Sequence, residues 1–360
     1  MRRASSRLAR GVTGPVGRVV LCVVVLVAAA GVAWASQGWR PGGRPDLATA
    51  LDSVPSNALT FSFTDWAQVR DVFPSDASDG GRLALAASTR DVSTRSVLAS
   101  TAEGLQKAFG WSVDDLRWEA FSQSAESSVV VTRFEDDLSM TTVQEGLQTS
   151  GYTREGDTWT ADATDLRAAQ VSDLLATVRL YPRQRLLVAS DLASAVRAAD
   201  RVHDGRSRSL ASFRPVAETT QALAGATSIF VQRGVLGCSS SEVSDPDDLD
   251  AASAALQRVG DLEPYTASGR ALSDTGQEGF GGQRLQLAMT FSDPDLARRQ
   301  LPVREALTSG QFIGRTGQVR DTLRLRSATT QGSTLSLDFD HDPDTDTFMS
   351  GSGAALFASC

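Results

Sequence analysis

Five aspartates alternate with other residues near the C-terminus, in the run DFDHDPDTD. Carboxylate oxygens are the ligands that Ca²⁺ prefers, so this spacing makes the run a candidate metal site. The run lacks the central glycine of an EF-hand loop and the glutamate at that loop's twelfth position, which favours a solvated acidic loop instead. The candidate ligands are Asp338, Asp340, Asp342, Asp344 and Asp346.

Two cysteines lie outside the apolar N-terminal segment, namely Cys238 and the last residue, Cys360. In an oxidising compartment an even pair predicts one disulfide, with two unpaired thiols as the alternative. The bridge would close a loop of more than a hundred residues and hold down the end of the chain.

Other side chains offer little for catalysis. The sequence contains no G-x-S-x-G turn, no phosphate-binding G-x-x-x-x-G-K-S/T loop and no C-x-x-C pair. The single lysine, Lys107, falls on an expected helix and should face solvent, and His203 falls at a helix C-terminus, where a cation is ordinary. We therefore expect no enzymatic activity and no cofactor.

The N-terminus carries a strong signal for export. Residues 19–35 are uncharged and apolar, and the basic segment 1–18 before them holds five arginines and no acidic residue. This pattern predicts a single-pass transmembrane anchor in the cell membrane, with the N-terminus cytoplasmic and the body extracellular. Ala33-Trp34-Ala35 also matches a signal-peptidase site, so cleavage after Ala35 and secretion is the alternative.

The net charge of the exported body limits the classes of partner that it can bind. The whole chain has a formal net charge of −8, and beyond residue 35 it has 30 basic against 43 acidic residues. An acidic body lacks the basic footprint that nucleic-acid binding needs. The expected partners are the membrane, through residues 19–35, and an envelope protein or glycan.

The body begins after a linker expected at 36–50, which starts rich in Gly, Pro and Arg. Alternation predicts a strand at 59–63, followed by a helix at 65–72 that is capped by Thr64 or Asp65. Helical spacing predicts another helix at 96–109. Ser112 and Asp115 form a capping arrangement, which predicts a further helix carrying Leu116, Trp118 and Phe121.

A strand–helix–hairpin pattern occurs twice, near 128–190 and 285–340. In each copy a strand ending in Phe leads to a capping Asp, a helix and the residues Thr-Ser-Gly, and paired strands follow. The pattern predicts a duplicated unit, divided between a first half at 51–225 and a second half at 226–360. The fold class expected is α+β, with antiparallel or mixed sheets and packed helices.

The chain resembles uncharacterised membrane-anchored exported proteins of high-GC Gram-positive bacteria. The resemblance rests on the opening Ser53-Val54-Pro55-Ser56-Asn57-Ala58-Leu59, on Ser150-Gly151-Tyr152 and on Leu187-Val188-Ala189-Ser190-Asp191. These motifs are structural and imply no ligand or catalytic residue. The leading hypothesis is a tethered, non-catalytic binding or interaction module. The alternatives are an envelope-polymer hydrolase with a Ca²⁺-assisted acidic site and a lipid or small-molecule carrier.

Overall fold

The computed structural model describes residues 46–73, 81–241, 243, 246–350 and 355–360. The expected anchor at 19–35 and its basic flank at 1–18 lie outside these ranges. Within them, no helix has both the length and the apolar character needed to cross a bilayer. Residues 46–360 form one compact unit.

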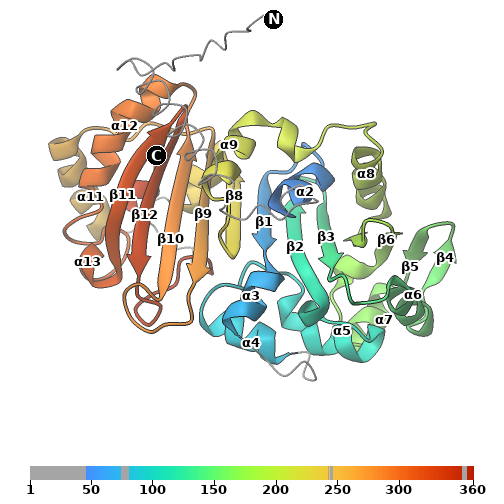
Figure 1. Cartoon of the computed structure of the whole chain (residues 1–360). Coiled ribbons are helices and arrows are strands. Elements are labelled where there is room, and N and C mark those ends of the chain that lie inside the picture. Colours follow the sequence, from blue (N-terminus) through green and yellow to red (C-terminus); the bar gives the residue numbers. More distant parts are fainter. Residues whose placement is uncertain (1–45, 74–80, 242, 244–245, 351–354) are drawn as a thin grey trace, which may run out of the picture. The chain divides into compact units, whose positions relative to one another are not determined.

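The described residues build a 12-stranded sheet in which all neighbouring strands are antiparallel (Figure 1). Its order is β11-β12-β10-β9-β8-β1-β2-β3-β7-β6-β5-β4. The α+β class is confirmed, and the sheet is of the antiparallel kind. The strands are β1 Thr60–Thr64, β2 Leu116–Gln123, β3 Ser128–Phe134, β4 Thr153–Glu155, β5 Thr158–Thr160, β6 Thr177–Tyr181, β7 Leu186–Ser190, β8 Ser228–Arg233, β9 Ala267–Asp274, β10 Gln283–Thr290, β11 Leu323–Gln331 and β12 Thr334–His341.

The two halves of the chain have matching strand orders. In the first half the order from the centre outward is β1-β2-β3-β7-β6, and in the second it is β8-β9-β10-β12-β11. β1 pairs with β8 and so joins the halves in one sheet. Both expected strand–helix–hairpin segments are present, with α6 between β3 and β6 and α12 between β10 and β11.

Helices cover both faces of the sheet. Side chains of α2, α8 and α9 pack into one buried cluster, and those of α3 to α7, α11 and α12 pack into another. The helices are α2 Asp46–Ser53, α3 Trp66–Val72, α4 Arg82–Thr89, α5 Ala102–Phe109, α6 Met140–Thr149, α7 Ala163–Ala168, α8 Ala193–His203, α9 Arg214–Ala222, α10 Gly234–Ser240, α11 Pro246–Val259, α12 Pro294–Ala306 and α13 Val319–Thr322. Short 3₁₀ turns lie at Ala99–Thr101, Val113–Asp115, Asp173–Leu175, Leu210–Ser212 and Leu356–Ala358.

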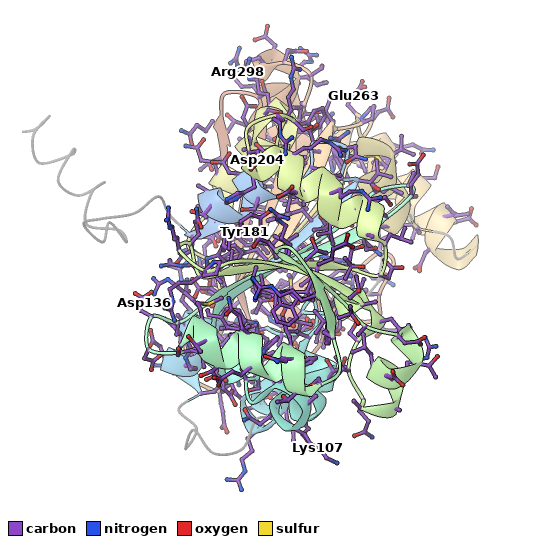
Figure 2. All side chains as sticks on the ribbon, turned by 90° about the vertical axis from the view of Figure 1, so that its right-hand side faces the viewer. Lys107, Asp136, Tyr181, Asp204, Glu263 and Arg298 are labelled. Carbon is purple, nitrogen blue, oxygen red and sulfur yellow. A yellow bond between two sulfur atoms is a disulfide. The ribbon has the colours of Figure 1, made fainter. Side chains whose placement is uncertain are left out.

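Several local predictions are confirmed. Asp65 caps α3 by accepting from the Gln68 N–H at 3.0 Å. α8 ends at His203, as expected. Lys107 lies on α5 with its side chain directed outward (Figure 2).

Three local predictions are wrong. In the first copy of the repeat, Ser139 rather than an aspartate caps α6, and its hydroxyl accepts from the Thr141 N–H at 3.2 Å. Ser112 and Asp115 do form a capping box, but it serves only the turn Val113–Asp115, and the residues carrying Trp118 form strand β2. β2 pairs with β1 on one side and β3 on the other, and this pairing overrides the local helix signal. The linker expected at 36–50 is also too long, because α2 begins at Asp46 and buries Ala50.

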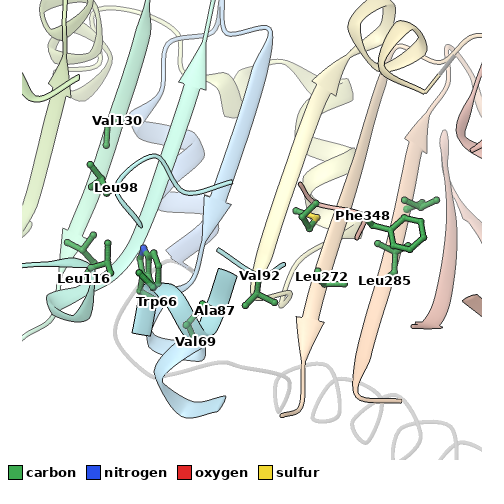
Figure 3. Packing of buried hydrophobic residues seen from close by; sticks show 14 of the residues in the cluster. Trp66, Val69, Ala87, Val92, Leu98, Leu116, Val130, Leu272, Leu285 and Phe348 are labelled. Atoms are coloured by element: carbon green, nitrogen blue, oxygen red, sulfur yellow. The ribbon is translucent and has the colours of Figure 1, made fainter. Parts of the chain in front are cut away.

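The strands separate two apolar cores, as their alternation requires. On β3, Val130 belongs to the first cluster, whereas Val129 and Val131 belong to the second. The first cluster draws on both halves of the chain, with Trp66 and Leu116 from one and Leu272 and Phe348 from the other (Figure 3). This shared core places first-half loops beside second-half strands.

Candidate functional site

The five candidate metal ligands do not form a common ligand set. Asp338 accepts from Nε and Nη2 of Arg284, both at 2.5 Å, and Asp340 accepts from Arg326 at 2.7 Å. Asp346 forms an ion pair with Arg315. Asp342 accepts from the Asp344 N–H at 3.1 Å, which is the local contact of a turn. Over the described ranges, no group of three or more His, Cys, Asp or Glu residues could hold a metal ion.

The histidine inside the acidic run has a structural setting. The ring of His341 is buried, and its Nδ1 lies 2.8 Å from Oε1 of Gln283. The Gln283 amide donates to Asp274 at 2.7 Å, and Asp274 in turn accepts two hydrogen bonds from Arg90. Burial lowers the pKa of His341, so the ring is neutral at neutral pH. This network links the first half to β9, β10 and β12.

The best candidate for a binding site is a pocket on the second half, which we call the arginine pocket. Its cavity volume is about 60 Å³, and it is partly open to solvent. It is bounded by β8, β9, β10, α10 and the segment 355–360, here called the C-terminal tail. The lining residues are Phe230, Gln232, Gly237, Ser240, Ser241, Tyr265, Ser268, Gly269, Arg270, Leu287, Met289, Arg315, Phe348, Ala355, Phe357 and Ala358.

Two arginines give the arginine pocket its charge. The guanidinium of Arg270 lies 5.3 Å from the centre of the Phe230 ring, and that of Arg315 lies 4.4 Å from the centre of the Phe348 ring. Burial, reinforced by Arg95 and Arg315, lowers the pKa of Arg270 to about 10. The side chain therefore remains a cation at neutral pH.

The C-terminal tail forms one wall of the pocket and is held by polar contacts. Hydroxyls of Ser241 and Tyr265 each donate to the carbonyl of Ala358 at 3.0 Å. From α12, the buried guanidinium of Arg304 donates to the carbonyls of Phe357 at 2.9 Å and Ser359 at 2.8 Å. The same guanidinium donates to Glu263 O at 3.0 Å.

A disulfide fastens the same tail to α10. The sulfur atoms of Cys238 and Cys360 lie 1.92 Å apart, in agreement with the bridge predicted from the sequence. Cys238 lies on α10 between Gly237 and Ser240, both of which line the pocket. The bridge thus joins two walls of the same pocket.

A loop from the first half supports the opposite side. Asp91 is buried, and its carboxylate accepts from the backbone N–H groups of Phe348, Met349 and Ser350 at 2.6 to 2.8 Å. This fixes Phe348 in the pocket lining. Arg95, four residues later, lies 4.1 Å from the centre of the Phe230 ring.

Strand register identifies the matching place in the first half. Phe134 ends β3 and Phe291 follows β10, at corresponding positions of the repeated segments. Two residues earlier, Thr132 pairs with Glu119, and Met289 pairs with Ser268. Glu119 and Ser268 are therefore equivalent.

The neighbouring strands β1 and β8 show that α3 and α10 also occupy corresponding positions. Glu119 pairs with Thr64 and Ser268 with Gln232, and each of these strands leads within two residues to a helix. The first residue of α3 is Trp66, and that of α10 is Gly234.

In the first half, side chains occupy the region that corresponds to the arginine pocket. Trp66 is fully buried, and its Nε1 donates to Glu119 at 3.3 Å. Glu119 also accepts from Ser96 Oγ at 2.5 Å and from the Val97 N–H at 2.7 Å. Burial raises the pKa of Glu119. The second half has Gly234 and Ser268 at these positions, and Ser268 lines the arginine pocket.

One glycine sets how closely α10 approaches the sheet. A Cβ at Gly237 would lie 2.3 Å from Ser268 Oγ and 2.9 Å from the ring of Tyr265. A side chain here would have to displace Ser268 Oγ and the Tyr265 ring, both of which belong to residues that line the pocket.

The sequence analysis did not identify Arg270 or Arg315 as site residues. β9 was not predicted as a strand, because its sequence ASGRALSD is poor in β-branched and aromatic residues. The one local signal for Arg270 is that it stands between the small residues Gly269 and Ala271. Arg315 lies in a loop after α12, where no pattern marks it.

Comparison with known proteins assigns no family. No family model and no curated protein matches the chain. Solved structures of TP0453 are similar at a low level, with a TM-score of 0.39 for crystal forms I, III and IV. Identity is 11% for form I and 9% for forms III and IV, and the matches cover 85% of this chain and 96% of TP0453.

Proposed function

We propose that this protein is an exported, membrane-tethered binding module of the cell envelope, without catalytic activity, that binds a small molecule in the arginine pocket. The observation that carries the proposal is the pocket itself. It combines buried apolar side chains, such as Met289 and Phe357, with a few polar groups, which is typical of ligand sites. We further propose that its two halves derive from a duplicated unit, of which the second carries the arginine pocket.

Among the alternatives, the small-molecule carrier gains support and the hydrolase does not. A Ca²⁺-assisted hydrolase would need clustered carboxylates, whereas Asp338, Asp340 and Asp346 are engaged with arginines. No aspartate or glutamate is among the described residues that line the pocket. A general acid or base of the glycosidase kind is therefore not provided there.

The tether is tested by the mass of the protein purified from membranes. We expect a chain that retains residues 19–35, because the apolar run is long enough to span a bilayer. A mature chain that begins at Ser36 would contradict the tether and would indicate secretion. That result would leave the binding proposal intact.

Binding is tested by closing the pocket. Ser240 lies on α10, lines the pocket and donates to Gln232 Oε1 at 2.7 Å. We expect Ser240→Trp to fill the pocket and weaken binding of the neutral dye N-phenyl-1-naphthylamine by about tenfold or more, since a bulky ring excludes the ligand. Dye fluorescence in a titration measures the dissociation constant.

The matched control is Ser239→Trp, one residue earlier on the same helix. Ser239 is exposed and bonds only within α10, so its substitution should leave dye affinity unchanged within about twofold. Equal binding by the wild type and Ser240→Trp would place the dye elsewhere and contradict the proposed site.

A further inference from the structure

The outer strand of the second half forms one end of the sheet. Among the described residues, β11 pairs with β12 on one side and with no strand on the other (Figure 1). At nine residues it is three times as long as β4, the three-residue strand at the opposite end. An edge strand presents a row of unpaired N–H and C=O groups, to which an extended segment of another chain can add as a further strand.

The first half covers the corresponding edge with its own chain. β6 and β11 are both the fifth strand outward from the centre of the sheet. In the first half the sheet continues, because β5 pairs with β6 and β4 pairs with β5. Trp159 of β5 lies opposite Val178 and is only 5% exposed, so the added strand also contributes to the core.

Strand register identifies the residue of β11 that corresponds to Val178. Val130 and Leu287 are equivalent, because each lies four residues before the phenylalanine of the repeated segment. From Val130 the paired residues lead across the sheet to Val178, and from Leu287 they lead to Ala328. No described strand lies opposite Ala328, where the first half has the strand of Trp159.

The second half uses its corresponding segment to line the arginine pocket. Like the β4–β5 hairpin, residues 311–318 follow a Thr-Ser-Gly sequence and fold back, with a bridge between Gln311 and Gln318. Arg315 in this turn pairs with Asp346 and lies 4.4 Å from the centre of the Phe348 ring. The segment completes the pocket and adds no strand to β11.

The two sides of β11 differ in chemistry. Leu325 and Ala328 pack against the first apolar cluster. Arg326 is 53% exposed and pairs with Asp340, whereas Arg324 is exposed, lies 3.6 Å from the centre of a phenylalanine ring and forms no ion pair with a described residue. Residues 319–331 contain three arginines and one aspartate, in a body that is acidic overall.

We propose that β11 binds an extended segment of a partner protein by strand addition, and that this segment alternates large apolar residues with acidic ones. Its apolar side chains would lie beside Leu325 and Ala328, as Trp159 lies beside Val178, and its carboxylates would face the arginines on the other side. A second copy of β11 fits less well, because its sequence LRLRSATTQ supplies arginines and no carboxylate. The inference does not depend on the arginine pocket.

The β11–β12 hairpin determines which backbone groups are directed toward the partner. The Phe291 N–H donates to Ser333 O, so Ser333 is directed toward β10 and the next residue, Thr334, toward β11. Backbone direction alternates along a strand. Gln331, which pairs with Thr334, is therefore directed toward β12, and Ala328, three residues earlier, directs its N–H and C=O outward.

Synthetic peptides test the proposal on the full chain in detergent. We expect the acidic peptide TEVEWEVT to bind about fivefold more tightly than its neutral counterpart TQVQWQVT at low ionic strength, since two partly exposed ion pairs together contribute about that factor. The acidic peptide with N-methyl groups on its six central residues loses the strand hydrogen bonds and should bind at least about tenfold more weakly. Fluorescence anisotropy of labelled peptides measures the dissociation constants.

A proline in the edge strand tests the location. Ala328→Pro removes an outward N–H and no hydrogen bond to β12, so it should weaken binding of the acidic peptide by at least about tenfold in a folded protein. The matched control is Arg154→Pro at the opposite end of the sheet. Arg154 lies between the two outer pairs of the β4–β5 hairpin, so its N–H is also directed outward, and affinity should stay within about twofold.

A further variant tests the charge. Arg324→Gln should lower the ratio of the acidic to the neutral affinity to about two. Arg214→Gln removes a cation that is 82% exposed on α9 and should leave the ratio at about five. Far-UV circular dichroism verifies that each variant is folded. If Ala328→Pro is unfolded, the N-methylated peptide and Arg324→Gln decide.

Several results would overturn the inference. Equal binding of the acidic and N-methylated peptides, or of the acidic peptide by the wild type and a folded Ala328→Pro, would exclude strand addition at β11. A neutral peptide that binds as tightly as the acidic one would exclude the acidic partner. A wild-type dimer in sedimentation that Ala328→Pro converts to a monomer would show that a second copy covers β11. Failure of both peptides to bind would also overturn the inference and would leave the dye experiments on the arginine pocket unaffected.

Discussion

Reduction of the Cys238–Cys360 disulfide is expected to lower the free energy of unfolding by about 5 kcal/mol, as estimated from the chain entropy of a loop of this length. The two cysteines are 122 residues apart. Without the bridge the unfolded chain gains freedom, and the C-terminal tail can separate from α10. The measurement is a denaturant titration of the oxidised protein and of the protein treated with a phosphine reductant.

Dye binding should also respond to reduction of the Cys238–Cys360 disulfide. Phe357 and Ala358 belong to the tail and line the arginine pocket, so reduction should weaken binding of the neutral dye. The control is the double variant Cys238→Ser/Cys360→Ser, which the reductant should leave unchanged. Two thiols that react with a labelling reagent in the untreated protein would contradict the bridge.

Replacement of Arg304 by methionine should lower the free energy of unfolding by nearly as much as reduction of the disulfide does. Its guanidinium is fully buried and donates to the carbonyls of Glu263, Phe357 and Ser359. Burial lowers its pKa to about 10, so it stays charged at neutral pH. Methionine keeps an unbranched apolar stem but leaves three acceptors without this donor, which should cost about 3 to 5 kcal/mol.

The matched control is Arg298→Met, six residues earlier on α12. Arg298 is exposed and pairs only with Asp295 on the surface (Figure 2). Its loss should change stability by less than about 1 kcal/mol. A similar effect of both substitutions in chemical unfolding would show that the buried hydrogen bonds of Arg304 do not hold the tail.

The disulfide and the Arg304 hydrogen bonds both hold the C-terminal tail. The effects of losing each on the free energy of unfolding should therefore not be additive. Once the disulfide is reduced, part of the tail can leave its site, and the hydrogen bonds from Arg304 then hold less structure. Combining Arg304→Met with reduction should therefore cost less than the sum of the two single effects.

Local sequence patterns were sufficient for much of the architecture. The repeated Phe, Asp and Gly positions predicted both strand–helix–hairpin segments, since capping and alternation depend on residues only a few positions apart. The even number of body cysteines predicted the bridge. The same local reasoning failed at β2, where the capping box was present but pairing with β1 and β3 decided the outcome.

The sequence alone also could not predict which side chains the aspartates of the acidic run contact. Alternating aspartates indicated possible oxygen ligands, but the pairing of β12 with β10 and β11 places Asp338 and Asp340 beside Arg284 and Arg326. Which arginine meets which aspartate depends on register between strands, and register follows from the whole sheet.

By itself, the sequence determined the α+β class, the repeated segments and the pairing of Cys238 with Cys360, and it predicts an address in the envelope through residues 19–35. Only the tertiary structure decided the site. The arginine pocket brings together β8, β9, α10, a loop carrying Arg315 and the end of the chain, and Asp91 of the first half holds part of its lining. These segments are far apart in sequence, and their meeting is set by long-range strand pairing and burial, which no local pattern encodes.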